Sequence, residues 1–454
     1  MRHPLRVAIA FALASTAVRL YLAHRYFGFQ TGDDVEIAEE AFRRALGLVF
    51  WPWEVRNLFL PDLLVAPFVA LGHALGVRDT FALAQIARYP FIALAGVNVV
   101  LLFLLGRRWY GDAVALTAAA LYSMHWIPLV YGSSLYPRTF AVTCILGAAI
   151  LLSRESTTAT RAVLAGVLAG LAVTARYSEA VYFFSLVLYV ASRRKALAGL
   201  TCGFAGTVVL AVGLYDRVTY GRWFGSLIEF AELTFIRRDA ASLVVFHPPW
   251  WYLTNLPHWL PLALLPGFVI AVRTEWRRAA IFVGLPLLAL SAIFHKELRY
   301  LQVVVPFAIL ISVHGLWSVR HRRRLVALLL VLAIPLGLTR IREVTKRSTN
   351  AAAAAIWIGA RQPRSVALSQ SWAYGGRMFL ANDVVTYEVG IPPDPATLRK
   401  EAPSLTVLAV YAHDASRALR AICAQHGLYE TATFSGRGGR AVVVFTARRA
   451  ASRR

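Results

Sequence analysis

Residues 81–105 read FALAQIARYPFIALAGVNVVLLFLL, and this stretch decides the fold class of the chain. A helix that spans a bilayer needs about 20 mostly apolar residues. The stretch exceeds that length and carries a single charged residue, Arg88. It therefore predicts a membrane-spanning helix.

The composition of the whole chain agrees with this prediction. Of its 454 residues, 58% are hydrophobic and 16% are charged, and the mean hydropathy is +0.57. Soluble domains are about 45–50% apolar and about 25% charged. The excess of apolar residues and the shortage of charged ones indicate a protein whose solvent is largely lipid.

Further apolar runs follow the same pattern along the first three quarters of the chain. They cover residues 7–23, 60–75, 113–130, 139–152, 162–190, 196–215, 256–272, 279–294, 301–317 and 325–338. Together they predict a polytopic α-helical membrane protein with about 10–12 spans. The run 162–190 is too long for one helix and contains Arg176 and Glu179, so we expect two short, re-entrant or kinked helices there.

The charges indicate how these spans are oriented. The chain has 48 Lys and Arg against 24 Asp and Glu, a formal net charge of +24. The basic residues form short clusters between apolar runs, such as Arg107-Arg108 and Arg193-Arg194-Lys195. Such clusters are typical of cytoplasmic loops and do not require a nucleic-acid partner. With these clusters and the N-terminus inside, segment 60–75 lies along the membrane or dips into it.

The same orientation places the remaining loops outside. The first outer loop is 27–60, and the others include 131–138, 216–255 and 295–299. We therefore predict a multi-pass protein of the cell membrane with its active site on the extracytoplasmic side. The membrane domain covers residues 1–345.

The tail, residues 351–454, has a different character and predicts a small extracytoplasmic α/β domain. Segments 365–368, 384–387, 405–410 and 440–446 have the β-branched content of strands. Segment 415–426 is expected to form an amphipathic helix after a cap at Asp414. The glycine-rich stretch 436–439 lacks the Lys-Ser/Thr pair of a phosphate-binding loop.

An acidic pair follows the first apolar run, in Gly32-Asp33-Asp34. One of two adjacent carboxylates can act as a general base towards a hydroxyl group. The alternative is a hydrated loop with an acidic helix N-terminus, which the helix dipole favours.

A second stretch in the same loop is Trp51-Pro52-Trp53-Glu54-Val55-Arg56-Asn57. Tryptophans beside an acid and a base suit either the aromatic belt of a membrane interface or a surface on which a sugar stacks.

The third stretch is His295-Lys296-Glu297-Leu298-Arg299-Tyr300, between two apolar runs. Ionisable residues at the edge of a membrane are costly. Its cations can hold a lipid phosphate by charge-assisted hydrogen bonds. They can also be anchors whose long side chains reach the membrane interface. The stretch is predicted to lie on the outer side of the membrane, where basic residues are uncommon, so a functional role is favoured over anchoring.

Three further residues are secondary candidates. Arg138 ends the outer segment Tyr136-Pro137-Arg138. Arg176 lies within an apolar run, and Glu179 at i,i+3 spacing can supply its partner.

These stretches resemble motifs of glycosyltransferase family 22, the dolichol-phosphate-mannose-dependent mannosyltransferases of N-glycan and GPI-anchor assembly. That family has an acidic pair in the first luminal loop, a Trp-Glu-containing stretch followed by Arg and Pro, and a His-Lys-Glu-x-Arg-Phe signature. The chain is similar over about residues 1–340 and has Thr31-Gly32-Asp33-Asp34 where the family usually has His-Pro-Asp-Glu. Its Arg- and Ala-rich composition without glycosylation sequons indicates a bacterial homologue.

The resemblance implies a GT-C fold and an inverting transfer of a hexose, mannose above all, from a polyprenyl-phosphate donor to a glycan or lipid-linked acceptor. The base would be Asp33 or Asp34. The donor phosphate would be bound by His295, Lys296 and Arg299. The supporting residues would be Glu297, Trp53, Glu54, Arg56, Arg138, Arg176 and Glu179.

Two other function classes stay open at this point. One is a transporter or flippase of polyisoprenoid-linked substrates, although the chain shows no internal symmetry of the kind such proteins have. The other is a non-catalytic membrane assembly subunit. No cofactor is required by the motifs; the acidic residues could hold a divalent metal, but no full ligand set is visible.

Overall fold

The computed structural model describes residues 3–25, 31–48, 54–154, 157–236, 246–319, 322–344, 349–369, 376–380, 384–390, 392–435 and 440–447. Its packing divides into two compact units. The first contains Met1–Leu20, Pro52–Leu60 and Pro90–Arg340, and the second contains Tyr21–Trp51, Pro61–Tyr89 and Ile341–Arg454. The domain boundary expected between residues 345 and 351 stays a prediction.

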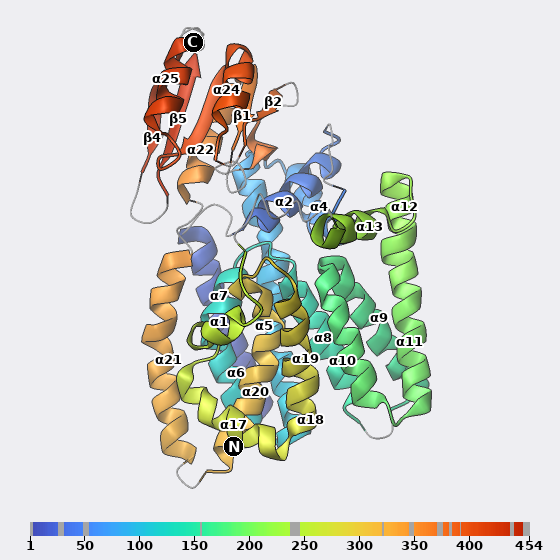
Figure 1. Cartoon of the computed structure of the whole chain (residues 1–454). Coiled ribbons are helices and arrows are strands. Elements are labelled where there is room, and N and C mark those ends of the chain that lie inside the picture. Colours follow the sequence, from blue (N-terminus) through green and yellow to red (C-terminus); the bar gives the residue numbers. More distant parts are fainter. Residues whose placement is uncertain are drawn as a thin grey trace. The chain divides into compact units, whose positions relative to one another are not determined.

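The first unit is helical (Figure 1). Four of its helices, α1, α3, α5 and α21, extend into the second unit. Its elements are α1 (Pro4–Arg25), α3 (Phe59–Leu64), α5 (Thr80–Tyr110), α6 (Asp112–Met124), α7 (Trp126–Tyr131), α8 (Arg138–Leu152), α9 (Ala159–Ala175), η1 (Tyr177–Ala180), α10 (Val181–Val190), α11 (Arg194–Val208), η2 (Val209–Leu214), α12 (Tyr215–Tyr220), α13 (Gly225–Ala231), η3 (Glu232–Ile236), α15 (Trp251–Thr254), α16 (Leu256–Trp259), η4 (Leu262–Leu264), α17 (Leu265–Thr274), α18 (Trp276–Ala279), η5 (Ala280–Gly284), α19 (Leu285–Ala292), η6 (Leu298–Gln302), α20 (Val304–Trp317) and α21 (Arg322–Val344).

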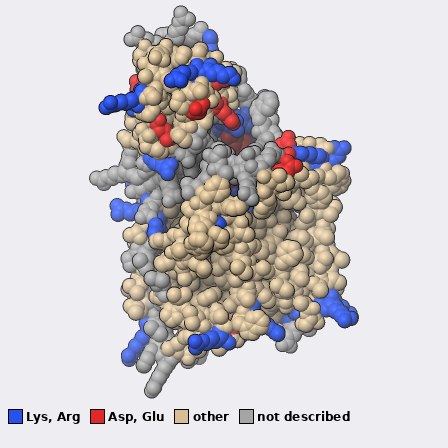
Figure 2. Space-filling model, viewed as in Figure 1, with Lys and Arg blue, Asp and Glu red and all other residues tan. Residues whose placement is uncertain are grey.

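Several of these helices suit a bilayer. Within the described residues, three are long and apolar enough to cross one: α1, α5 and the continuous helical stretch Arg194–Tyr220. Seven shorter apolar helices accompany them. In the face of the first unit shown in Figure 2, uncharged side chains cover the length of the helices, and Lys and Arg gather at their ends. This distribution is that of a membrane protein.

The run 162–190 is interrupted as the sequence predicted. Helix α9 ends at Ala175, and Arg176 has extended backbone (φ −161°, ψ 131°) before the short helix η1 and then α10 begin. A second break, between α6 and α7, was not expected. There His125 leaves the helix, accepts from the N–H of Ile127 at 3.2 Å, and its Nε2 contacts the carbonyl of Trp259 at 3.0 Å.

Glycines allow α9 and α11 to pack with their backbones in close contact (Figure 1). A Cβ atom added at Gly203 would lie 2.1 Å from the carbonyl oxygen of Val163, and one at Gly166 would lie 2.1 Å from that of Leu200. Small residues four apart permit this approach in membrane helices, where packing rather than the hydrophobic effect holds helices together.

We therefore expect Gly203→Ala to separate α9 from α11 and to lower the thermal stability of the detergent-solubilised protein. Overpacking of this kind costs about 1–3 kcal/mol. Gly206→Ala is the matched control, because nothing lies within 4 Å of a Cβ atom added there. Equal melting temperatures for the two variants would contradict the role of close backbone contact.

The second unit contains a five-stranded sheet of order β2-β1-β3-β5-β4. Its strands are β1 (Ser365–Leu368), β2 (Val385–Glu388), β3 (Val407–Tyr411), β4 (Leu428–Phe434) and β5 (Val442–Ala447). Strands β2, β1 and β3 are parallel, whereas β5 runs antiparallel to β3 and β4. In register, Val366 pairs with Val407 and Leu408 with Phe445.

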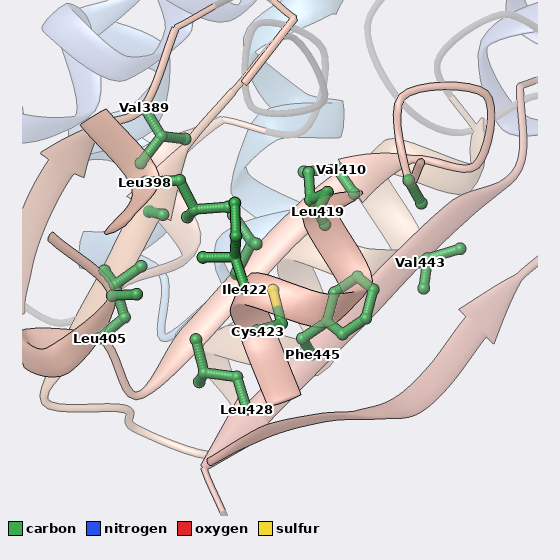
Figure 3. Close-up of a cluster of buried hydrophobic side chains, with 14 residues drawn as sticks. Val389, Leu398, Leu405, Val410, Leu419, Ile422, Cys423, Leu428, Val443 and Phe445 are labelled. Atoms are coloured by element: carbon green, nitrogen blue, oxygen red, sulfur yellow. The ribbon is translucent and has the colours of Figure 1, made fainter. Parts of the chain in front are cut away.

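Helices complete this unit. They are α2 (Gly32–Ala45), α4 (Ala66–Ala74), α22 (Thr349–Gly359), η7 (Arg377–Phe379), α24 (Pro395–Glu401), η8 (Ala402–Ser404) and α25 (Arg417–Gln425). Apolar side chains of α24 and α25, such as Leu398, Leu419 and Ile422, form one buried cluster with Leu408 and Phe445 of the sheet (Figure 3). A second cluster joins α22 to strands β1, β3 and β5.

Four of the strands and the helix near residues 415–426 match the sequence predictions within about two residues. The expected cap at Asp414 is wrong, because the Ser416 hydroxyl accepts from the N–H of Leu419 and caps α25. Strand β4 was missed. Its residues Glu430, Thr431 and Thr433 are polar, and it lies at the edge of the sheet, where burial does not impose an apolar pattern.

Candidate active site

A buried ion pair organises the centre of the first unit. The side chains of Arg138 and Glu179 are 4% and 3% exposed, and Arg138 Nε donates to Glu179 Oε1 at 2.6 Å. The other nitrogens of Arg138 donate to the Tyr136 hydroxyl at 2.7 Å and to Ser178 Oγ at 2.9 Å. All three nitrogens of this guanidinium group are therefore bound, which fixes it in one orientation.

The pairing differs from the one expected. Arg176 and Glu179 were taken as an i,i+3 pair, but the carboxylate of Glu179 binds Arg138 instead. The reason is the extended backbone at Arg176, which ends α9 and removes the helical spacing on which the expectation rested. That expectation is wrong.

Two tyrosines connect this ion pair to the His295–Tyr300 stretch. The guanidinium carbon of Arg138 lies 4.4 Å from the centre of the Tyr300 ring. That of Arg299 lies 5.6 Å from the ring of Tyr136 and 5.6 Å from the ring of Tyr300. Arginine over an aromatic ring is stabilised by the negative face of the ring. Residues far apart in the sequence thus form one cluster of cations and aromatic rings.

Glu297 binds two of the cations proposed from the sequence. Its Oε1 accepts from Arg299 at 2.6 Å and lies 2.9 Å from His295 Nε2. The side chains of Glu297 and His295 are about one third and one quarter exposed, so a ligand can reach them. The shared carboxylate holds His295 and Arg299 side by side, and two such groups together can attract an anion.

Lys296 points to the backbone. It is 2% exposed, and its ammonium group donates to the carbonyls of Ile293 at 2.5 Å and His247 at 3.0 Å. Burial lowers its pKa. The backbone N–H of His247 donates to the carbonyl of Phe294 at 3.1 Å, and Lys296 adds a second link between these two segments.

Burial also lowers the pKa of His247, and the neighbouring charges of His295 and Lys296 act in the same direction. Its ring stacks on Trp251 with 4.6 Å between centroids. An imidazole at the edge of this cluster was not expected from the sequence, because only the packing places residue 247 close to residue 295.

The Glu54–Asn57 stretch is held by α12 and the turn that follows it. Glu54 accepts from Arg222 at 2.8 Å, the carbonyl of Arg56 accepts from the Tyr220 hydroxyl at 2.6 Å, and Asn57 Nδ2 donates to Asp216 at 3.0 Å. Trp53, which was expected beside them, lies outside the described residues. Asp216 was not singled out from the sequence.

The acidic pair belongs to the second unit. Asp33 and Asp34 lie in the first turn of α2 and are 8% and 0% exposed. The hydroxyl of Thr31 donates to Asp34 Oδ1 at 2.9 Å and accepts from its backbone N–H at 3.2 Å. A capped helix N-terminus stabilises carboxylates at these positions.

Arg88 is a partner of this pair that the sequence reasoning did not identify. It is 2% exposed, and its charge interacts with that of Asp34. It also donates to the carbonyl of Ala23 and to Gln85 Oε1, both at 3.3 Å. A charged residue alone in an apolar run of 25 residues needs a partner. The position of Arg88 in the sequence could therefore have marked it as the partner of an acidic residue.

A metal-binding cluster was left open by the sequence. Within the described residues, no three His, Cys, Asp or Glu side chains are grouped so that they could hold a metal ion.

Comparison with known sequences identifies related proteins. The model of the Alg9-like mannosyltransferase family matches residues 33–355. GPI alpha-1,2-mannosyltransferase 3 of Xenopus laevis is 23% identical over 270 residues, which cover 57% of this chain and 50% of that protein. The Bos taurus protein of the same name is 23% identical over 337 residues, 68% of this chain and 61% of that protein. The chain thus spans about half to three fifths of these relatives.

Solved structures share the fold. ArnT from Cupriavidus metallidurans has a TM-score of 0.67 at 14% identity in the apo state, covering 98% of this chain and 99% of that one. Its complex with undecaprenyl phosphate has a TM-score of 0.63 at 13% identity, with the same coverage. The oligosaccharyltransferase of Archaeoglobus fulgidus has a TM-score of 0.59 at 12% identity, covering 92% and 71%. The expected GT-C fold is confirmed.

Proposed function

The chain belongs to the Alg9-like mannosyltransferase family, and from this premise we propose that it transfers a hexose, mannose in the first instance, from a polyprenyl-phosphate donor to an extracytoplasmic glycan or lipid-linked acceptor. The observation that carries the proposal is the cluster of Arg138, Arg299, Tyr136 and Tyr300 beside His295. Within it, the partly exposed His295 and Arg299 suit the binding of a phosphate. The buried Arg138 and Tyr136, whose polar groups bind one another, hold Arg299 and Tyr300 in place.

In the proposed reaction, an acceptor hydroxyl attacks the anomeric carbon of the donor sugar. The new C–O bond forms as the bond from the anomeric carbon to the phosphate oxygen breaks, and its electron pair leaves with the polyprenyl phosphate. The configuration inverts. A carboxylate takes the hydroxyl proton, and His295, Lys296 and Arg299 stabilise the charge that builds on the phosphate.

Of the two carboxylates, we assign the base to Asp33. Asp34 is fully buried, bound to the Thr31 hydroxyl and balanced by Arg88, whereas Asp33 retains some exposure. A base must reach the proton that it removes. Asp34 then orients the start of α2, and Glu54 and Arg56 line the acceptor side.

The proposal includes a multi-pass topology with the reaction on the extracytoplasmic face. It is supported by the basic residues at the ends of the first-unit helices, which are typical of cytoplasmic loops. The donor lipid and the surrounding membrane lipid would be the partners on this surface.

The test is an in vitro transfer assay with purified protein in lipid nanodiscs. Radiolabelled polyprenyl-phosphate hexoses are supplied as a panel, with octyl α-mannoside as a defined acceptor and an envelope lipid extract as a second one. We expect transfer from one donor, with inversion at the anomeric carbon. Donor binding without transfer to either acceptor would overturn the enzyme assignment and favour a transport or assembly role.

A further inference from the structure

The turn between α12 and α13 has an unusual backbone. Phe224 has φ +53° and Gly221 has φ +77°. A bulky residue in the left-handed region is rare and persists only where its surroundings enforce it. The Phe224 ring packs against Gly213, where an added Cβ atom would lie 2.6 Å from the ring. The turn is thus held in a costly conformation by its neighbours.

Asp216 closes this turn. It is 0% exposed, and its Oδ2 accepts from both the N–H of Ser226 at 2.9 Å and the Ser226 hydroxyl at 2.5 Å. Its Oδ1 accepts from Asn57 Nδ2 at 3.0 Å. Because all three partners donate, the carboxylate serves as an acceptor on both oxygens. Buried carboxylates with several donors are strong anchors.

Helix α12 and its closed turn hold the Glu54–Asn57 stretch at three points. Besides Asn57, they bind Glu54 through Arg222 and the carbonyl of Arg56 through Tyr220. Asn57 Oδ1 in turn accepts from the N–H of Phe59 at 3.1 Å, which fixes the start of α3. Glu54 to Asn57 therefore have their positions set by α12 and its turn.

The same network reaches the cationic cluster. The Ser226 hydroxyl, which donates to Asp216, makes a short hydrogen bond with the Tyr177 hydroxyl, so Tyr177 is the donor in that bond. Tyr177 begins η1, the turn whose Ser178 and Glu179 bind Arg138. An unbroken path within the first unit thus joins the Glu54–Asn57 stretch to Arg138.

We propose that Asp216 is a positioning residue that sets the acceptor side of the reaction by fixing the Glu54–Asn57 stretch through Asn57 and the α12–α13 turn. The inference rests on the proposed function, in which this stretch lines the acceptor side. Asp216 itself touches neither substrate. Its loss should affect use of the acceptor far more than cleavage of the donor.

The variants follow from the hydrogen-bond chemistry. In Asp216→Asn, an amide oxygen facing Ser226 leaves the amide NH₂ facing the NH₂ of Asn57, and two donors cannot pair. In the double variant Asn57→Asp/Asp216→Asn, the new amide can donate to the new carboxylate, which restores this bond but not the bond from Asn57 Nδ2 to the carbonyl of Ala211 at 3.2 Å. Asp112→Asn, which changes an exposed carboxylate paired with Arg107, is the matched control.

Two reactions of the same sugar donor, transfer to an acceptor and hydrolysis by water, distinguish a defect on the acceptor side from a defect in donor cleavage. We measure transfer of labelled mannose to octyl α-mannoside and its release to water in the absence of acceptor. Asp216→Asn should raise the acceptor KM by about tenfold or more, as expected for a misplaced binding group, and leave hydrolysis of the donor within about twofold of wild type. The double variant should regain part of the acceptor affinity, because only the bond between residues 57 and 216 is restored.

A second measurement does not depend on activity. Limited trypsin digestion followed by mass spectrometry reports cleavage after Arg56, which should rise several-fold in Asp216→Asn and return towards the wild-type level in the double variant. Unchanged cleavage, or donor hydrolysis that falls as much as transfer, would overturn the inference. A wild-type protein that shows no transfer at all, with the trypsin pattern as expected, would instead overturn the proposed function.

Discussion

Replacement of Asp33 by Asn should lower kcat for sugar transfer by roughly 10²–10⁴-fold, the usual contribution of a general base. Asn has nearly the same shape but cannot take a proton. The substitution removes the interaction of the charge with the N-terminus of α2, about 0.3–1 kcal/mol, so we expect a small decrease in melting temperature. Transfer from the polyprenyl-phosphate donor, measured beside a thermal unfolding curve, checks both statements.

Asp34→Asn supplies the contrast. In this variant, the buried charge of Arg88 loses the Asp34 carboxylate with which it interacts. This variant should therefore melt at a lower temperature, and the protein that remains folded should retain more activity than Asp33→Asn. Full activity in Asp33→Asn together with inactive but stable Asp34→Asn would transfer the role of base to Asp34.

The second large effect concerns Glu179. Glu179→Gln keeps an acceptor for Arg138 Nε but removes the negative charge from a pair whose side chains are 4% and 3% exposed. Removing one partner of a buried ion pair costs about 3–5 kcal/mol. We expect a much lower melting temperature in nanodiscs and, at a temperature where the variant is still folded, a strong loss of transfer.

The double variant Arg138→Met/Glu179→Leu distinguishes stability from function. Apolar residues in place of a buried ion pair are often neutral for stability, so most of the melting temperature should return. Activity should not return, because the bonds of Arg138 to Tyr136 and Ser178 and its contact with Tyr300 are lost. A double variant as unstable as Glu179→Gln would show that the charge imbalance is not the cause.

Much of the fold follows from local patterns. Helix α5 and the interrupted run that became α9, η1 and α10 were predicted from hydropathy and from the charged residues within it. Four strands of the tail followed from β-branched content, whereas β4 did not, because an edge strand with polar residues has no apolar pattern. The break at His125 depends on the carbonyl of Trp259, which is distant in the sequence.

The site was predicted less completely. The stretches with Asp33, Glu54 and His295 were found because charged residues at the edge of apolar runs are costly and therefore informative. The partners of those stretches were not. Arg138 was thought secondary, Glu179 was assigned to the wrong arginine, and Asp216 was overlooked.

The sequence by itself determined that this is a membrane protein, since the transfer energies of residues along one helix add up regardless of what surrounds it. The GT-C fold was an expectation from the resemblance of its motifs to glycosyltransferase family 22. Only the tertiary structure decided which charges pair, as with Arg138 and Glu179, 41 residues apart. The physical reason is that a buried charge must find a countercharge or hydrogen-bond partner, and which one lies within reach depends on how the helices pack.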